Sequence, residues 1–143
     1  RALLGGAFMG NIVHGNQAVA NQEVNPEVLD LVDEAFKKET GSMLFHEVTE
    51  AYIGAQISIK EKVSAKEAIY GVENPIFNKA HSKASPQSGS LELERYDSNG
   101  DVMYGGEGEA AYYKLIAKPS TDIYGGFKRD VIKDKLTIEE IMR

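Results

Sequence analysis

The 143-residue sequence contains no cysteine. This absence excludes disulfides, thiol nucleophiles and thiolate metal ligands together. It leaves the compartment open, because chains without disulfides occur both inside and outside cells. The side chains left for metal binding are the three histidines and the carboxylates.

Long apolar runs and clusters of basic residues are also missing. No run approaches the roughly 18 apolar residues that span a membrane, so no membrane insertion is expected. The chain has 16 Lys and Arg against 22 Asp and Glu, a net charge of −6. Neutralising phosphates requires clustered Lys and Arg, so we expect no nucleic-acid partner. The acidic balance suits a cationic partner and also favours solubility.

The length and composition predict one soluble domain spanning residues 1–143, with 42% hydrophobic and 27% charged residues. The chain begins with Arg1 rather than Met, and its opening is too short and too glycine-rich for a signal peptide. We therefore expect a fragment of a larger polypeptide, secreted or delivered as part of it, with a junction near Gly5-Gly6.

The most informative stretch is 42–57, which reads SMLFHEVTEAYIGAQI. On a helix, His46 and Glu50 lie one turn apart on one face. Apolar residues fall on the opposite face and beside this one, which is typical of a buried central helix. An imidazole and two carboxylates are costly to bury without partners, so we expect a metal ion or a polar network around them.

Local signals place further helices around this stretch. Asn25-Pro26 and Asn74-Pro75 each combine an N-cap with a proline at the first helical position. Gly41 should end the first helix, and Ser42 should cap the central one. In the helix that begins at Asn74-Pro75, the inward face is shared by Phe77, Ala80, His81 and Ala84.

Strand signals flank the helices. Turn residues Gly15-Asn16 predict a hairpin near the start of the chain, with His14 exposed beside the turn. The second half predicts a β-meander from alternation and turn chemistry. The remaining expected features are a helical turn over 65–70, strands over 91–96, 101–104, 110–117 and 131–132, turns at 98–100 and 125–126, and a terminal helix capped by Thr137. The predicted fold class is α+β, with N-terminal helices and the central helix packed on a small antiparallel meander.

A catalytic zinc requires three protein ligands and one open position. His46 and Glu50 supply two ligands, and His81 is our first choice for the third. Glu47 lies where the general base of an HExxH site lies. Weaker ligand candidates are Glu73, Glu92 and Glu94, and Tyr52 or Tyr96 are candidates for steadying an oxyanion.

Two other readings stay open. The same carboxylates can form a buried hydrogen-bond network with His81 in a non-enzymatic binding domain, or the chain can be a toxin with a metal-independent activity. The segment Asp97–Asp101 has part of a calcium-loop pattern, but its spacing favours a hairpin turn.

Several stretches together resemble C-terminal toxin-type domains of Rhs-repeat proteins in Bacteroidetes: GGAFMGN (5–11), VNPEVL (24–29), HEVTEAYIGAQIS (46–58), AHSKASPQSG (80–89) and YDSNGD (96–101). This resemblance implies an effector used in interbacterial competition, released from a larger polypeptide and paired with an immunity protein.

The helix at 46–52 also resembles the active helix of zincin metallopeptidases. His46 matches the first zinc ligand and Glu47 the general base, whereas Glu50 stands where the family has a second His. This resemblance implies a zincin-like fold, a zinc cofactor and a protein or peptide substrate. His81 has no counterpart in the zincin motif.

Overall fold

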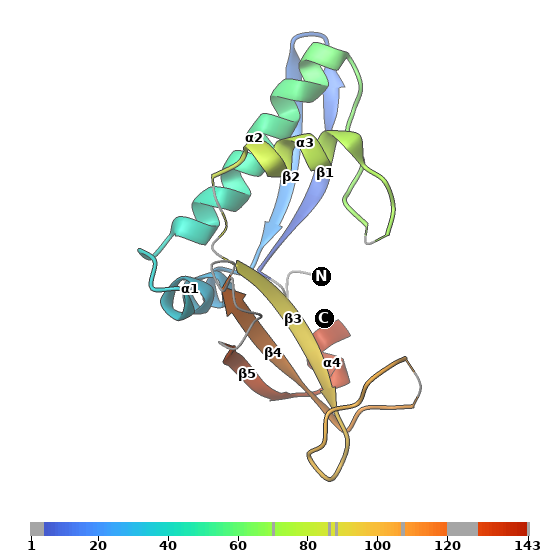
Figure 1. The fold of residues 1–143 in the computed structure, drawn as a ribbon. Helices are drawn as coiled ribbons and strands as arrows, with labels where there is room; N and C mark the ends of the chain where they lie inside the picture. The colour runs from blue at the N-terminus through green and yellow to red at the C-terminus, as the bar shows by residue number, and fades with distance from the viewer. Residues whose placement is uncertain are drawn as a thin grey trace.

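The computed structural model describes residues 5–69, 71–85, 87, 89–106, 108–119 and 129–142. Within them the fold is α+β, as predicted, with helices on two small antiparallel sheets (Figure 1). The elements in chain order are β1 (Gly6–His14), β2 (Gln17–Val24), α1 (Pro26–Ala35), α2 (Ser42–Glu61), α3 (Pro75–Lys83), β3 (Gly89–Tyr96), β4 (Tyr112–Pro119), β5 (Asp130–Leu136) and α4 (Ile138–Met142).

The N-terminal hairpin is confirmed. β1 and β2 pair antiparallel around Gly15, which has the positive φ of 59° that glycine adopts readily. Their register shifts between Phe8 and Asn11, where Gly10 has a φ of 80°. A Cβ at Gly10 would lie 2.3 Å from the carbonyl oxygen of Ala65, so only glycine allows this close approach.

The predicted helical turn over 65–70 is wrong. Residues 65–69 instead have no regular secondary structure and lie beside β1, where the Asn11 amide donates to the Ala65 carbonyl at 3.0 Å and the Ala68 amide to the Phe8 carbonyl at 2.9 Å; residue 70 lies outside the described residues. Tertiary pairing to the strand edge satisfies backbone groups of this segment, which removes the need for a local helical turn.

α2 lies along the hairpin and also contacts α3 (Figure 1). A small core of Phe8, Ala65 and Ile76 closes this half of the molecule. The expectation that the central helix packs on the meander is therefore wrong. Only its first turn, through Met43, reaches the core beside the meander.

The meander β3–β4–β5 packs against α1 around Val28, Leu29, Val32 and Leu115. α1 begins after Asn25, whose side chain accepts from the Val28 amide at 3.3 Å, as predicted. It ends at Ala35 rather than at Gly41.

The meander's connections match the predictions in part. The strand expected over 101–104 is reduced to one bridge between Tyr96 and Val102, and the turn expected at 125–126 lies outside the described residues. Thr137 caps α4 as predicted, accepting from the Glu140 amide at 3.2 Å.

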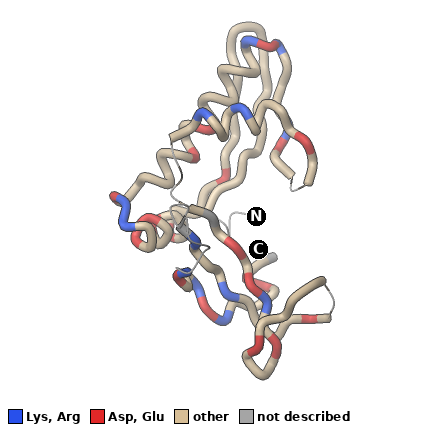
Figure 2. Tube along the Cα trace, viewed as in Figure 1, with Lys and Arg blue, Asp and Glu red and all other residues tan. Residues whose placement is uncertain are grey.

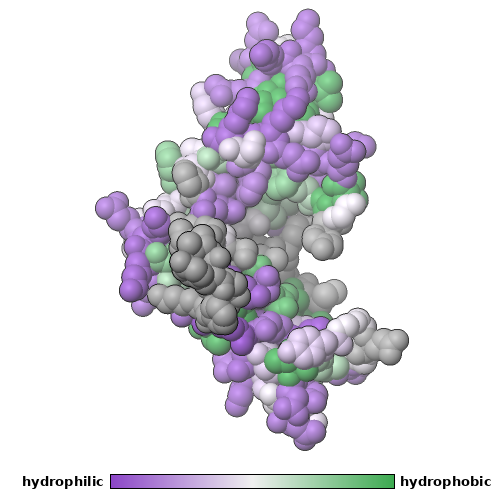
Figure 3. Space-filling view, viewed as in Figure 1, coloured by the Kyte–Doolittle hydropathy of each residue, from purple (hydrophilic) through white to green (hydrophobic). Residues whose placement is uncertain are grey.

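α2 buries one face only, which corrects the expectation of a helix buried all round. Phe45 and Tyr52 are 60% and 63% exposed, and Leu44 and Val48 are exposed beside them. The buried face carries His46 and its polar neighbours instead. Surface hydrophobic residues of this kind also show among the predominantly hydrophilic surface in Figure 3.

Charges of both signs lie on the strands of the meander (Figure 2). Lys118 pairs with Glu92 at 2.6 Å, and Lys114 lies 3.8 Å from Asp134. In the described part of the chain, no helix combines the length and apolar character that a membrane crossing requires.

Candidate metal centre

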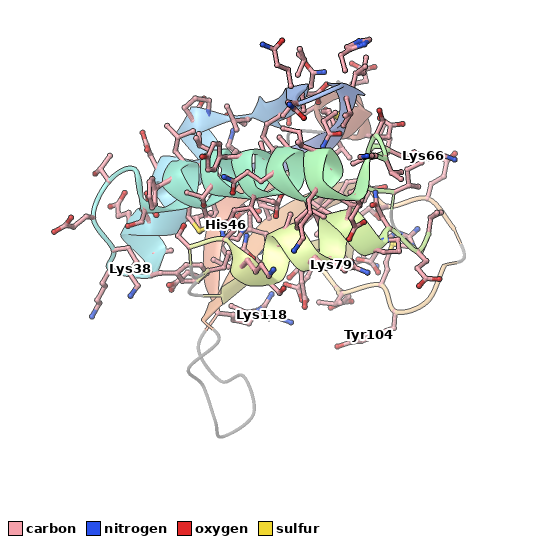
Figure 4. All side chains as sticks on the ribbon, turned by 90° about the horizontal axis from the view of Figure 1, so that it is seen from above. Lys38, His46, Lys66, Lys79, Tyr104 and Lys118 are labelled. Atoms are coloured by element: carbon pink, nitrogen blue, oxygen red, sulfur yellow. The ribbon has the colours of Figure 1, made fainter. Side chains whose placement is uncertain are left out.

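Three ionisable side chains lie on the buried face of α2. His46, Glu47 and Glu50 are only 2%, 6% and 3% exposed. His46 lies on the side of α2 that faces α3 (Figure 4). Burying groups of this kind costs several kcal/mol unless each finds a partner, so their partners indicate what the site does.

The His46 ring is held in one orientation. Its Nδ1 contacts the carbonyl oxygen of Ser85, and because a carbonyl only accepts, Nδ1 carries the hydrogen. The other ring nitrogen, Nε2, is buried and has no hydrogen-bond partner among the described residues. It lies 3.5 Å from Oε2 of Glu50. Two electron-rich atoms therefore face each other, and a cation between them, either a proton or a metal ion, would stabilise this arrangement.

The Ser85 carbonyl is itself fixed to α2. The Ser85 amide donates to the hydroxyl of Thr49 at 3.3 Å, and the single hydrogen of that hydroxyl is shared between the Phe45 and His46 carbonyls, at 2.9 and 3.0 Å. A histidine that binds metal usually donates its second N–H to a carbonyl or carboxylate, as His46 does here.

His81 of α3 completes the group. Its Nδ1 lies 2.5 Å from Oε2 of Glu50, and its ring meets the His46 ring edge-on, with centroids 5.1 Å apart. His46, Glu50 and His81 each offer one ligand atom, and these atoms lie within 4.8 Å of one another. The predicted approach of His81 to the His46–Glu50 pair is therefore present. Its side chain is 42% exposed, so His81 forms the solvent-facing edge of the site rather than part of the core.

The donor set suits a divalent metal ion. Two imidazoles and one carboxylate are common zinc ligands, and a fourth position toward solvent is typical of catalytic rather than structural sites. The unpartnered Nε2 of His46 is the atom that such an ion would satisfy.

Glu47 points toward the hairpin. Its Oε2 accepts from the Gln22 side-chain amide at 2.6 Å. A Cβ at Gly6 would lie 2.2 Å from the same carboxylate, so the missing side chain of Gly6 makes room for it. Glu47 is not part of the three-residue group, but the same Gln22 amide nitrogen lies 3.4 Å from Oε1 of Glu50.

Burial is the largest influence on the pKa of each of these groups, and their neighbours decide the net direction. Burial and the adjacent Glu50 charge raise the pKa of Glu47. Burial would also raise the pKa of Glu50, but its contacts with His46 and His81 lower it. Burial lowers the pKa of His46, yet contacts with Glu50 and the Ser85 carbonyl leave it raised overall. The site thus favours positive charge beside Glu50.

Asp33 holds the start of α2, where Ser42 was expected to act as the cap. The buried carboxylate accepts from the Gly41 amide at 2.9 Å and from the Met43 amide at 3.1 Å. Gly41 is the N-cap residue and provides no side-chain bond. Asp33 therefore links the end of α1 to the helix that carries the site.

The other candidates from the sequence lie elsewhere. Glu92 and Glu94 pair with Lys118 and Arg129 in the meander, and Glu73 is exposed. The two oxyanion candidates also lie elsewhere: Tyr52 is exposed on the outer face of α2, and Tyr96 is buried in the meander. His14, which was not a site candidate, is exposed as predicted.

The segment at 97–101 forms the expected turn. The Asp97 carboxylate accepts from the amides of Asn99 and Asp101, both at 2.9 Å, so its oxygen serves the turn. This geometry favours the hairpin reading over the calcium-loop pattern.

Gln22, Gly6, Ser85 and Asp33 were not predicted to serve the site. The contacts of Gln22 and Ser85 join residues that are 25 to 39 positions apart in the sequence. No local sequence pattern predicts contacts between residues so widely separated. Comparisons with protein-family models, with curated proteins and with solved structures gave no match.

Proposed function

We propose that this chain is a zincin-like, metal-dependent hydrolase that acts on a protein or peptide. The observation that carries the proposal is the buried, unpartnered Nε2 of His46 facing Glu50 beside His81. His46, Glu50 and His81 would hold the metal ion, for which zinc fits best. A bound zinc ion would make its water more acidic and polarise a substrate carbonyl.

Each side chain of the site has a separate task in this proposal. His46 is oriented by the Ser85 carbonyl, so its Nε2 is the ligand atom. His81, at the solvent edge, borders the side from which substrate arrives. Glu47 is the proton carrier, since Gln22 occupies only Oε2 and leaves Oε1 to accept a proton.

The resemblance to Rhs-associated domains also supports a biological role for the proposed hydrolase. It supports a toxin tip that is delivered to a rival cell and neutralised by an immunity protein. The zincin-like resemblance and two of the three proposed metal ligands concern the same helix, α2, and this agreement favours the hydrolase over the other toxin activities.

The second candidate is a metal-free binding domain with a closed polar network. The 2.5 Å contact between His81 and Glu50 favours it, because a single proton satisfies both groups without any metal. This second candidate predicts a folded protein that does not bind zinc and that loses stability when His46 is replaced by alanine.

Metal analysis separates the two candidates. Purified protein incubated with zinc and then dialysed should retain about one equivalent. Glu50→Gln and His81→Ala should each reduce retention strongly. His14→Ala is the matched control, since it removes an exposed histidine far along the hairpin. Retention of less than a tenth of an equivalent by the unaltered chain would refute the metal site.

Hydrolysis is tested on the loaded protein. Glu47→Gln should keep the metal and abolish cleavage of an unstructured protein substrate. If growth inhibition by the expressed chain survived this change, cleavage at this site would not be its cause.

A further inference from the structure

Gln22 is the one side chain from β2 that reaches both carboxylates of α2. Its Nε2 lies 2.6 Å from Oε2 of Glu47 and 3.4 Å from Oε1 of Glu50. Its own Oε1 is buried and has no hydrogen-bond partner among the described residues. Leaving a buried polar atom unsatisfied is unfavourable, and a purely structural contact would have to offset this cost.

The two carboxylates need such a donor. They lie three residues apart on one helix face, where like charges repel. In the described ion pairs, no Lys or Arg pairs with either of them. The amide of Gln22 has two hydrogens, one for each carboxylate, and it adds no net charge. It can therefore hold both groups without competing with a bound cation.

The same amide decides which oxygen of each carboxylate stays free for other partners. With Oε1 of Glu50 turned to Gln22, Oε2 is the oxygen beside His46 and His81. With Oε2 of Glu47 turned to Gln22, its other oxygen is left to act. Partners that orient ligands in this way commonly govern the affinity of a metal site.

The hairpin fixes the place of Gln22. In the register of β1 and β2, Gln22 is opposite Phe8, whose ring packs into the core beside Gly54 of α2. Gly6, two positions along β1, leaves the space that the Glu47 carboxylate fills. Both strands thus contribute to one wall of the site.

We propose that Gln22 is a positioning residue of this centre, which orients the metal ligand Glu50 and the proton carrier Glu47 together. The inference rests on the proposed metal-dependent function. It adds that β2 belongs to the functional site, although neither ligand nor base lies on it.

Gln22→Met tests this role, because methionine has a similar length and no hydrogen to donate. Gln17→Met is the matched control, an exposed glutamine on the same strand. Zinc affinity is measured by competition with a chromophoric chelator, and the visible spectrum is recorded after cobalt substitution. We expect Gln22→Met to weaken zinc binding by about 10- to 100-fold and to alter the cobalt spectrum, with Gln17→Met unchanged.

The outcomes are distinguishable. Unchanged affinity and spectrum in a folded Gln22→Met protein would overturn the role of Gln22 and leave the metal site intact. Failure of the unaltered chain to bind zinc or cobalt would overturn the proposed function, and with it this role. If Gln22→Met does not fold, Gln22→Asn withdraws the amide by one methylene, and the same loss of affinity is expected.

Discussion

Replacing Asp33 with alanine tests how the helix that carries the site is anchored. The carboxylate is 1% exposed and accepts from two amides at the start of α2. A hydrogen bond to a charged group contributes about 1.5–3 kcal/mol, and loss of a helix N-cap costs about 1 kcal/mol. Because water reaches this position poorly, the Gly41 and Met43 amides would lack a replacement partner. We therefore expect Asp33→Ala to lower the free energy of unfolding by about 3 kcal/mol.

The assay is urea unfolding of the metal-free protein at neutral pH, followed by circular dichroism. Asp30→Ala is the matched control, because Asp30 is an exposed aspartate on the same helix. It should change the unfolding free energy by less than about 0.5 kcal/mol. Asp33→Asn keeps one acceptor and should fall between the two. A loss below about 1 kcal/mol for Asp33→Ala would show that other contacts hold the start of α2.

Further predictions concern pH, packing and exposure. Burial lowers the pKa of His46, but contacts with Glu50 leave this pKa above its ordinary 6.5. The folded, metal-free protein therefore holds the second proton of the His46 ring more tightly than the unfolded chain does. Its free energy of unfolding should consequently fall as the pH rises from about 6 to about 8. Zinc competes with the same proton, so zinc affinity should rise over this range, and a metal-free protein that gained stability there would contradict the reasoning. Gly6→Ala should cost about 1–3 kcal/mol in urea unfolding through overlap with the neighbouring carboxylate, whereas Gly106→Ala, which meets nothing within 4 Å, should be near neutral. Tyr52→Ser should change unfolding free energy by less than about 1 kcal/mol, since this side chain is 63% exposed, and a cost above about 3 kcal/mol would restore the expectation of a fully buried helix.

Local chemistry explains which parts of the fold the sequence predicted. Asn25 and Asn74 both cap helices because their side chains bond amides three residues away, a contact that needs no tertiary structure. The pairing of His46 with Glu50 follows in the same way from the pitch of a helix.

Tertiary contacts explain what the sequence could not predict. The apolar residues of α2 lie on both sides of the helix, so their pattern does not say which face meets the hairpin. The segment after α2 has helical composition but pairs with β1, because Gly10 lets the two backbones approach. Gln22 becomes part of the site only once the hairpin lies on α2.

In most helices, substitutions are tolerated at polar positions and not at apolar ones. In α2 we expect the opposite, because some of its polar side chains face inward and several apolar ones face solvent. In a saturation-mutagenesis library selected for the folded state, the outer apolar positions such as Phe45 and Val48 should accept many residue types. The polar positions His46, Glu47 and Glu50 should accept few. A sequence profile of the selected variants would then show conserved polar residues at positions that hydropathy alone would assign to the protein surface.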